Sequence, residues 1–239
     1  MNTIRLWIAV PAAGVAPHFG SRKPGPDSHF GNGNRNANPA PTRKAVAMSS
    51  LARHFCTMAA NNAWANHRLL TACAHLSQQE FTATRTSFFP SLKATLNHIV
   101  TVDWYYVDAL ERACASQPVN ADARGFFDPQ EPFATCAEIM AAQHAVDARL
   151  IETCRKLTDT QLELPVALLR RAGVQHETAA RLLAHLFQHQ IHHRGQAHAM
   201  LAGTSVAPPP LDEFFCANEA HLRAAELAEL GLSEEMIWK

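Results

Sequence analysis

An all-α fold is predicted for this 239-residue chain: a four-helix bundle with a long crossover between its third and fourth helices, plus a short C-terminal helix. Three observations support the prediction. Four segments after residue 47 carry apolar residues three or four positions apart, the spacing of a helix that buries one face. No segment there alternates apolar and polar residues as a half-buried strand would. A long stretch separates the third segment from the fourth, as a crossover requires.

The first two helices are placed by their capping residues. Ser49 or Ser50 can cap a first helix that runs to about Leu76. Pro90 suits the first turn of the second helix, because a residue there needs no N–H partner. That helix is expected to end before Pro118.

The third helix is predicted over residues 134–157, and the segment after it fits a helix poorly. This segment, QLELPVALLRRAGVQH at residues 161–176, contains Pro165 and Gly173. Both residues break a long helix. We therefore expect a short extended or hairpin-like crossover there.

The fourth helix is predicted from a cap at Thr178 to about Ala202, with Gly203 as its C-terminal stop. Three consecutive prolines at 208–210 then make a stiff connector. A short terminal helix is expected over residues 212–230.

Residues 1–47 differ in composition from the rest of the chain. They hold six of the fourteen prolines and five of the ten glycines, without a hydrophobic period. Such a segment buries too little apolar surface to order itself. We interpret it as a disordered N-terminal tail or a mis-called upstream extension, and residues 48–239 as the helical domain.

The charge distribution and the cysteine content limit which functions and which compartment are expected. Residues 1–47 carry six Lys or Arg and one Asp, so the remaining 192 carry 15 Lys or Arg against 20 Asp or Glu. An acidic domain does not suit nucleic acid, which is bound by clustered Lys and Arg. No apolar run reaches the roughly 18 residues of a membrane span. The six cysteines form no CxxC pair, so a reducing, cytoplasmic location is expected.

The segment HLFQHQIHHRGQAH contains five histidines. Residues four apart share one face of a helix. His185, His189 and His193 therefore form a ladder expected to face the core, while His192 and His198 turn to other faces. Imidazoles one helical turn apart can supply two nitrogens to one divalent cation.

A third ligand has to come from a facing helix. His98 lies amid apolar residues at the inward spacing of the second helix, which suggests a site of His98, His189 and His193 with water in open positions. Zinc, nickel, cobalt or ferrous iron accept such ligands. Core histidines satisfied by hydrogen bonds are the alternative. Gln190 stands where the HExxH proteases have their general base, so protease chemistry is not expected.

The same residues carry a family resemblance. HLFQHQIHHRGQ resembles the fourth-helix signature of the DinB/YfiT-like superfamily, in which H-x3-H is followed directly by Arg-Gly-Gln. LNHIVTVDWYYVDAL and ANNAWANHRLL resemble its second and first helices. The resemblance covers about residues 48–215. It implies a four-helix bundle with a long crossover, often a homodimer, and His98, His189 and His193 as metal ligands.

The resemblance also assigns neighbouring positions. His185 matches a family position beside the site rather than a ligand. Arg194, Gly195 and Gln196 match the HRGQ element and are interpreted as structural. Gly195 would let another helix approach closely, and Arg194 would pair with a carboxylate on an adjoining helix.

The expected function is that of a divalent-metal-dependent enzyme with an open three-histidine site. It would act as a thiol-dependent S-transferase or isomerase, as the resemblance implies for some family members, or as a hydrolase. A low-molecular-weight thiol or another small molecule is the expected partner. Asp103, Tyr105 and Asp147 are candidates to orient a ligand or substrate. The alternative is a non-catalytic, metal-stabilised or dimerising module; His185 pointing into the site would favour it by closing the coordination sphere.

Overall fold

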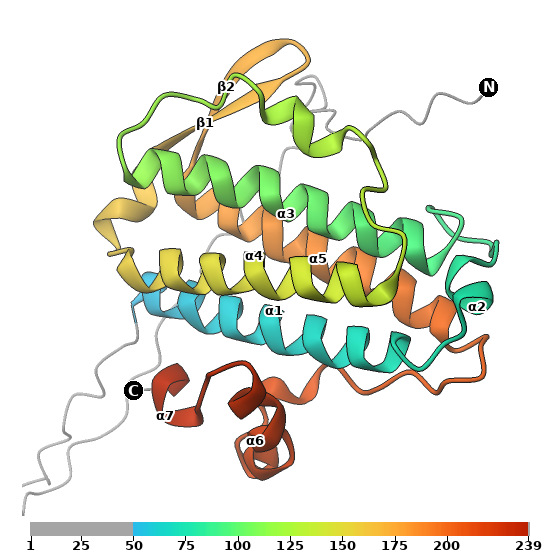
Figure 1. Ribbon diagram of the computed structural model, residues 1–239. Helices are drawn as coiled ribbons and strands as arrows, with labels where there is room; N and C mark the ends of the chain where they lie inside the picture. The colour runs from blue at the N-terminus through green and yellow to red at the C-terminus, as the bar shows by residue number, and fades with distance from the viewer. Residues whose placement is uncertain (1–49, 239) are drawn as a thin grey trace, which may run out of the picture. The chain divides into compact units, whose positions relative to one another are not determined.

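The computed structural model describes residues 50–238, and the predictions for residues 1–47 lie outside them. Four long helices lie side by side and form a bundle (Figure 1). This confirms the predicted all-α four-helix architecture. The four helices are α1 (Leu51–Cys73), α3 (Leu92–Cys114), α4 (Cys136–Lys156) and α5 (Ala179–Leu201).

Side-chain caps set where the long helices begin. Ser50 accepts a hydrogen bond from the backbone of Arg53 and caps α1, and Thr178 caps α5, both as predicted. The helix α3 begins after Ser91 rather than at Pro90, because the Pro90 carbonyl accepts the N–H of Arg85 and stays in the preceding loop.

The helix α1 ends three residues before the predicted Leu76. Beyond it, a capping box of Ser77 and Glu80 starts the five-residue helix α2 (Gln78–Thr82), which the sequence analysis did not predict. Five residues are too few to show a helical period of apolar residues.

The crossover contains a β-hairpin, which confirms the extended, hairpin-like prediction. Strand β1 (Pro165–Arg170) pairs antiparallel with β2 (Gly173–Thr178), and Arg170 opposes Gly173 at the turn. The positive φ of Gly173, 115°, suits the turn because glycine has no Cβ to clash. The hydroxyl of Tyr105 donates to the carbonyl of Leu169 at 3.0 Å and ties the hairpin to α3.

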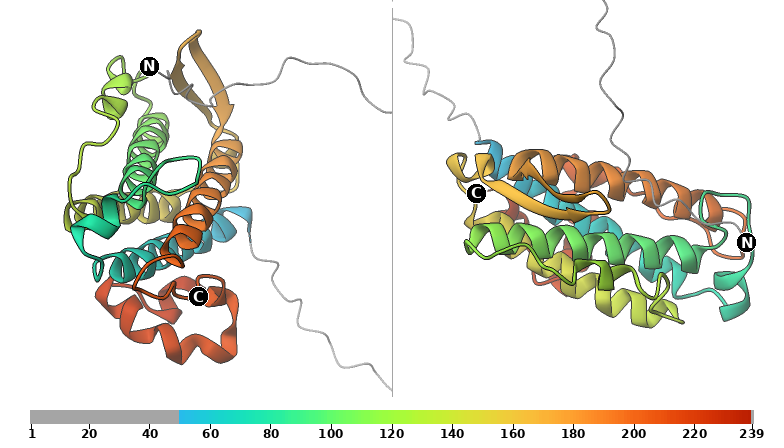
Figure 2. Two further views of the ribbon diagram at one scale, coloured as in Figure 1. Left: turned by 90° about the vertical axis from the view of Figure 1, so that its right-hand side faces the viewer. Right: turned by 90° about the horizontal axis from the view of Figure 1, so that it is seen from above.

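The C-terminal region differs from the single predicted helix over 212–230. Two 3-10 turns precede α6 (Ala220–Glu229), and α7 (Glu234–Trp238) follows a turn at Gly231, whose φ is 67°. Both helices pack against α1 (Figures 1 and 2). The Nε1–H of Trp64 donates to Glu226 at 2.6 Å, and the ring of Phe214 lies 5.6 Å from that of Trp64. The single helix predicted over residues 212–230 is therefore replaced by shorter elements, because the chain turns to cover α1.

Candidate metal centre

Three histidines converge from two helices that pack against each other. His98 comes from α3, and His189 and His193 lie one turn apart on α5. The Nε2 atoms of His98 and His189 face each other at 3.0 Å, and the ring of His193 lies 4.6 Å from His98 and 4.4 Å from His189. One nitrogen of each residue lies within 4.8 Å of the other two. The structure therefore brings together the three residues that the sequence analysis proposed.

Burial keeps the three imidazoles neutral. Burial, and then the neighbouring imidazoles, lower the pKa of His98 to about 3 and that of His189 to about 2. The pKa of His193 is also lowered by burial. Neutral rings at pH 7 keep the lone pairs that metal coordination needs.

The orientation of His193 is set by Gln196. The side-chain oxygen of Gln196 lies 2.9 Å from Nδ1 of His193. Because this oxygen can only accept, Nδ1 carries the proton and Nε2 keeps a free lone pair. The amide nitrogen of Gln196 in turn reaches Nε2 of His192 at 3.1 Å. Holding the second ring nitrogen in this way is a common support for a metal-binding histidine.

The arrangement fits a divalent metal ion. Zn–N bonds of roughly 2.0–2.1 Å at a tetrahedral angle place two ligand nitrogens roughly 3.3 Å apart, close to the 3.0 Å between His98 and His189. Three neutral imidazoles are also the donor set that zinc and later first-row metals accept.

His185 lies outside the cluster, and its predicted core-facing direction is wrong. The residue is exposed, its ring is 6.3 Å from that of His189, and it packs against Tyr106 at 5.4 Å. At 3.6 residues per turn, each i,i+4 step rotates by roughly 40°, so a three-residue ladder drifts off a single face. His192 and His198 point elsewhere, as predicted.

Two phenylalanines in the loop before α3 cover the histidines. The ring of Phe89 lies 4.4 Å from His98 and 5.6 Å from His193, and Phe88, 54% exposed, lies 6.2 Å from His193. Neither phenylalanine was predicted from the sequence to lie at the site. The pattern that could have indicated them is the aromatic pair in SFFP, because connections between helices usually carry polar residues.

A buried polar layer crosses the bundle beside the histidines and separates two apolar clusters of the core. Gln190 and Arg194 each follow a histidine of the cluster and point into this layer. Its members come from all four long helices: Asn62, Asn66, Asp103, Gln143, Asp147, Gln190 and Arg194.

Arg194 is the cation of this polar layer. Its Nη1 donates to the side-chain oxygens of Asn62, of Asn66 at 3.0 Å and of Gln190 at 3.2 Å. The expected direct pairing with a carboxylate is therefore wrong: amides lie between Arg194 and Asp147, whose carboxylate accepts from both asparagines. Amide groups can bridge because they both donate and accept.

The proposed orienting residues form no direct hydrogen bond to the three histidines in residues 50–238. Asp103 accepts from Gln143 at 2.8 Å and from Gln190, so it reaches the site only through the neighbour of His189. Burial, and then the other buried carboxylate, raise the pKa of Asp103; burial likewise raises the pKa of Asp147. The hydroxyl of Tyr105 is engaged by the hairpin.

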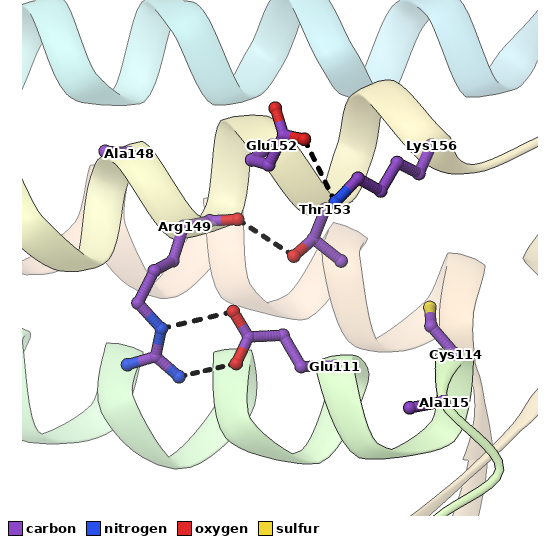
Figure 3. A pocket seen from close by; sticks show the side chains of 8 residues that line it. All are labelled: Glu111, Cys114, Ala115, Ala148, Arg149, Glu152, Thr153 and Lys156. Atoms are coloured by element: carbon purple, nitrogen blue, oxygen red, sulfur yellow. Dashed lines mark hydrogen bonds and ion pairs between the residues drawn. The ribbon is translucent and has the colours of Figure 1, made fainter.

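A separate surface hollow of 640 Å³ lies between α3 and α4 (Figure 3). Its charges pair with one another: Arg149 with Glu111 at 2.6 Å, and Lys156 with Glu152 at 3.0 Å. Burial raises the pKa of the Cys114 thiol there, which disfavours a reactive thiolate. Among residues 50–238, the groups that line the hollow form no cluster of three metal ligands, and its thiol is not activated as a nucleophile.

Comparison with known protein families gives a match that spans this site. No curated protein gave a significant match. None of the helices in residues 50–238 is long and apolar enough to cross a membrane. The model of the DinB family matches residues 48–226, which include all three histidines. The chain therefore belongs to the DinB family.

Proposed function

We propose that this protein binds one divalent metal ion through His98, His189 and His193 and is a metal-dependent enzyme. The convergence of three neutral imidazoles without a fourth protein ligand carries the proposal. Among residues 50–238, no other His, Cys, Asp or Glu joins this group. Three protein ligands and an open position are typical of catalytic sites, whereas structural sites are closed by four.

The proposed reaction is transfer or isomerisation that uses a low-molecular-weight thiol, and hydrolysis is the second candidate. A divalent metal ion at this site would lower the pKa of a bound thiol or water. Two residues of the chain would support this chemistry. Gln196 holds the proton on Nδ1 of His193, and Phe89 shields one side of the cluster from water. Zinc, nickel, cobalt and ferrous iron all suit the donor set.

Metal analysis of protein purified without added metal tests the site. We expect about one divalent ion per chain, and its loss in His98→Ala and in His189→Ala. His221→Ala is the matched control, because His221 is exposed on α6 and lies outside the group. Full retention of metal in either ligand variant contradicts the three-histidine site. Stoichiometric metal without binding of any thiol favours the alternative, a metal-stabilised or dimerising module.

We also propose that the protein is a homodimer and that it lies in a reducing cytoplasm. All six cysteines are free, which suits a reducing compartment.

A Cβ built on Gly195 meets nothing within 4 Å, so the close helix approach predicted there does not occur within the described chain. Ile191, 47% exposed one turn earlier on α5, offers apolar surface to a second copy. Sedimentation velocity of the wild type and of Ile191→Glu tests this, with a monomeric wild type refuting it.

A further inference from the structure

Arg170, at the end of β1, is a cation with unused hydrogen-bond donors. Its Nη2 donates to the hydroxyl of Tyr106 at 3.1 Å. Its Nε and Nη1 are buried and have no hydrogen-bond partner in residues 50–238. A buried donor without a partner is costly, and it is rare in folded proteins unless a ligand or water uses it.

The surroundings of Arg170 are aromatic rather than acidic. Its guanidinium carbon lies 5.3 Å from the centre of the Tyr105 ring and 5.5 Å from that of Tyr106. No carboxylate of the described chain lies within ion-pair distance of it. Glu177, which is close enough to influence His185, pairs with Arg181 at 3.3 Å. Buried arginines are normally paired with an anion, so an anion is the missing partner.

The unpaired guanidinium connects to the metal centre through a row of ring contacts. Tyr106 bridges them, because its hydroxyl accepts from Arg170 while its ring packs at 5.4 Å on His185. The ring of His185 lies 6.3 Å from that of His189. Tyr106 and His185 therefore stand between Arg170 and the histidine cluster.

We infer that Arg170 binds a carboxylate of the small molecule that the proposed three-histidine site takes. The second half of this inference rests on the proposed function; the anion site does not. Arg170 is half-buried, so its side chain is partly open to solvent. Guanidinium groups match carboxylates in shape and charge.

Calorimetric titration with glutathione and with its diethyl ester tests the inference on zinc-loaded protein. The ester keeps the thiol but lacks the carboxylates. We expect wild type to bind glutathione at least about tenfold more tightly than the ester, as a charge-assisted hydrogen bond predicts. Arg170→Gln should bring this ratio close to one, while Arg170→Lys keeps part of it. The zinc content of both variants should equal that of wild type.

Arg171→Gln is the matched control, since it removes the same charge from an exposed neighbour. Equal ratios in wild type and Arg170→Gln, or no preference in wild type, overturn the inference. Titration of metal-free protein with S-methylglutathione separates the two proposals, because this probe cannot supply a thiolate. If only the metal proposal is wrong, Arg170→Gln still weakens binding of this probe; no weakening there overturns the anion site.

Discussion

The substitution Arg194→Met tests whether the buried polar layer holds the bundle together. Methionine has a similar length but no charge and no donor. Removing the Arg194 donors leaves the side-chain oxygens of Asn62, Asn66 and Gln190 without this partner. Each unsatisfied buried acceptor costs about 1–3 kcal/mol, and breaking a buried charge network costs about 3–5 kcal/mol.

We expect Arg194→Met to lower the free energy of unfolding by about 3–5 kcal/mol, a large share of the about 5–15 kcal/mol typical of a domain. Urea denaturation followed by circular dichroism measures the loss. The dependence of this loss on pH is a second readout. The positive charge of Arg194 lowers the pKa of Asp103 and of Asp147, so its removal should cost more at pH 8, where both tend to ionise, than at pH 5.

The control is Arg171→Met, an exposed site where a change within about 0.5 kcal/mol is usual. A loss below about 1 kcal/mol for Arg194→Met would show that the polar layer repacks around the gap. An equal loss at pH 5 and pH 8 would refute the coupling of Arg194 to the buried carboxylates.

Three further predictions follow from the same geometry. Burial raises the folded-state pKa of Asp103 to about 7, so the folded state holds a proton that the unfolded state has released, and stability falls as the pH rises from about 4 to about 7. Asp103→Asn should flatten this fall in the free energy of unfolding between pH 5 and 8. An unchanged slope contradicts the prediction. Tyr105→Phe should lower the free energy of unfolding by about 1 kcal/mol through the lost bond to Leu169 and leave metal content unchanged; loss of metal would place Tyr105 at the site. Gly195→Ala should raise the stability of the monomer unit by about 1 kcal/mol, the helix propensity difference; a destabilised protein, or a weakened dimer by sedimentation, would show that Gly195 is packed against a second copy.

Local sequence was sufficient for the long helices and for two of the histidines. Apolar spacing located all four helices, and the caps Ser50 and Thr178 placed two of their starts. His189 and His193 share a helical turn, so their proximity follows from backbone geometry alone. Short elements such as α2 and α7 were missed, because five residues show no period.

Sequence by itself determined the fold class and the proximity of His189 and His193 on one helix. Only the tertiary structure decided their surroundings: His185 lies outside the group, Phe89 covers it, and Arg194 is joined to its carboxylates through amides. His98 and His189 are 91 residues apart along the chain. Contacts across such separations depend on how whole helices pack and rotate, and a rotation of one residue, about 100°, exchanges a core side chain for an exposed one.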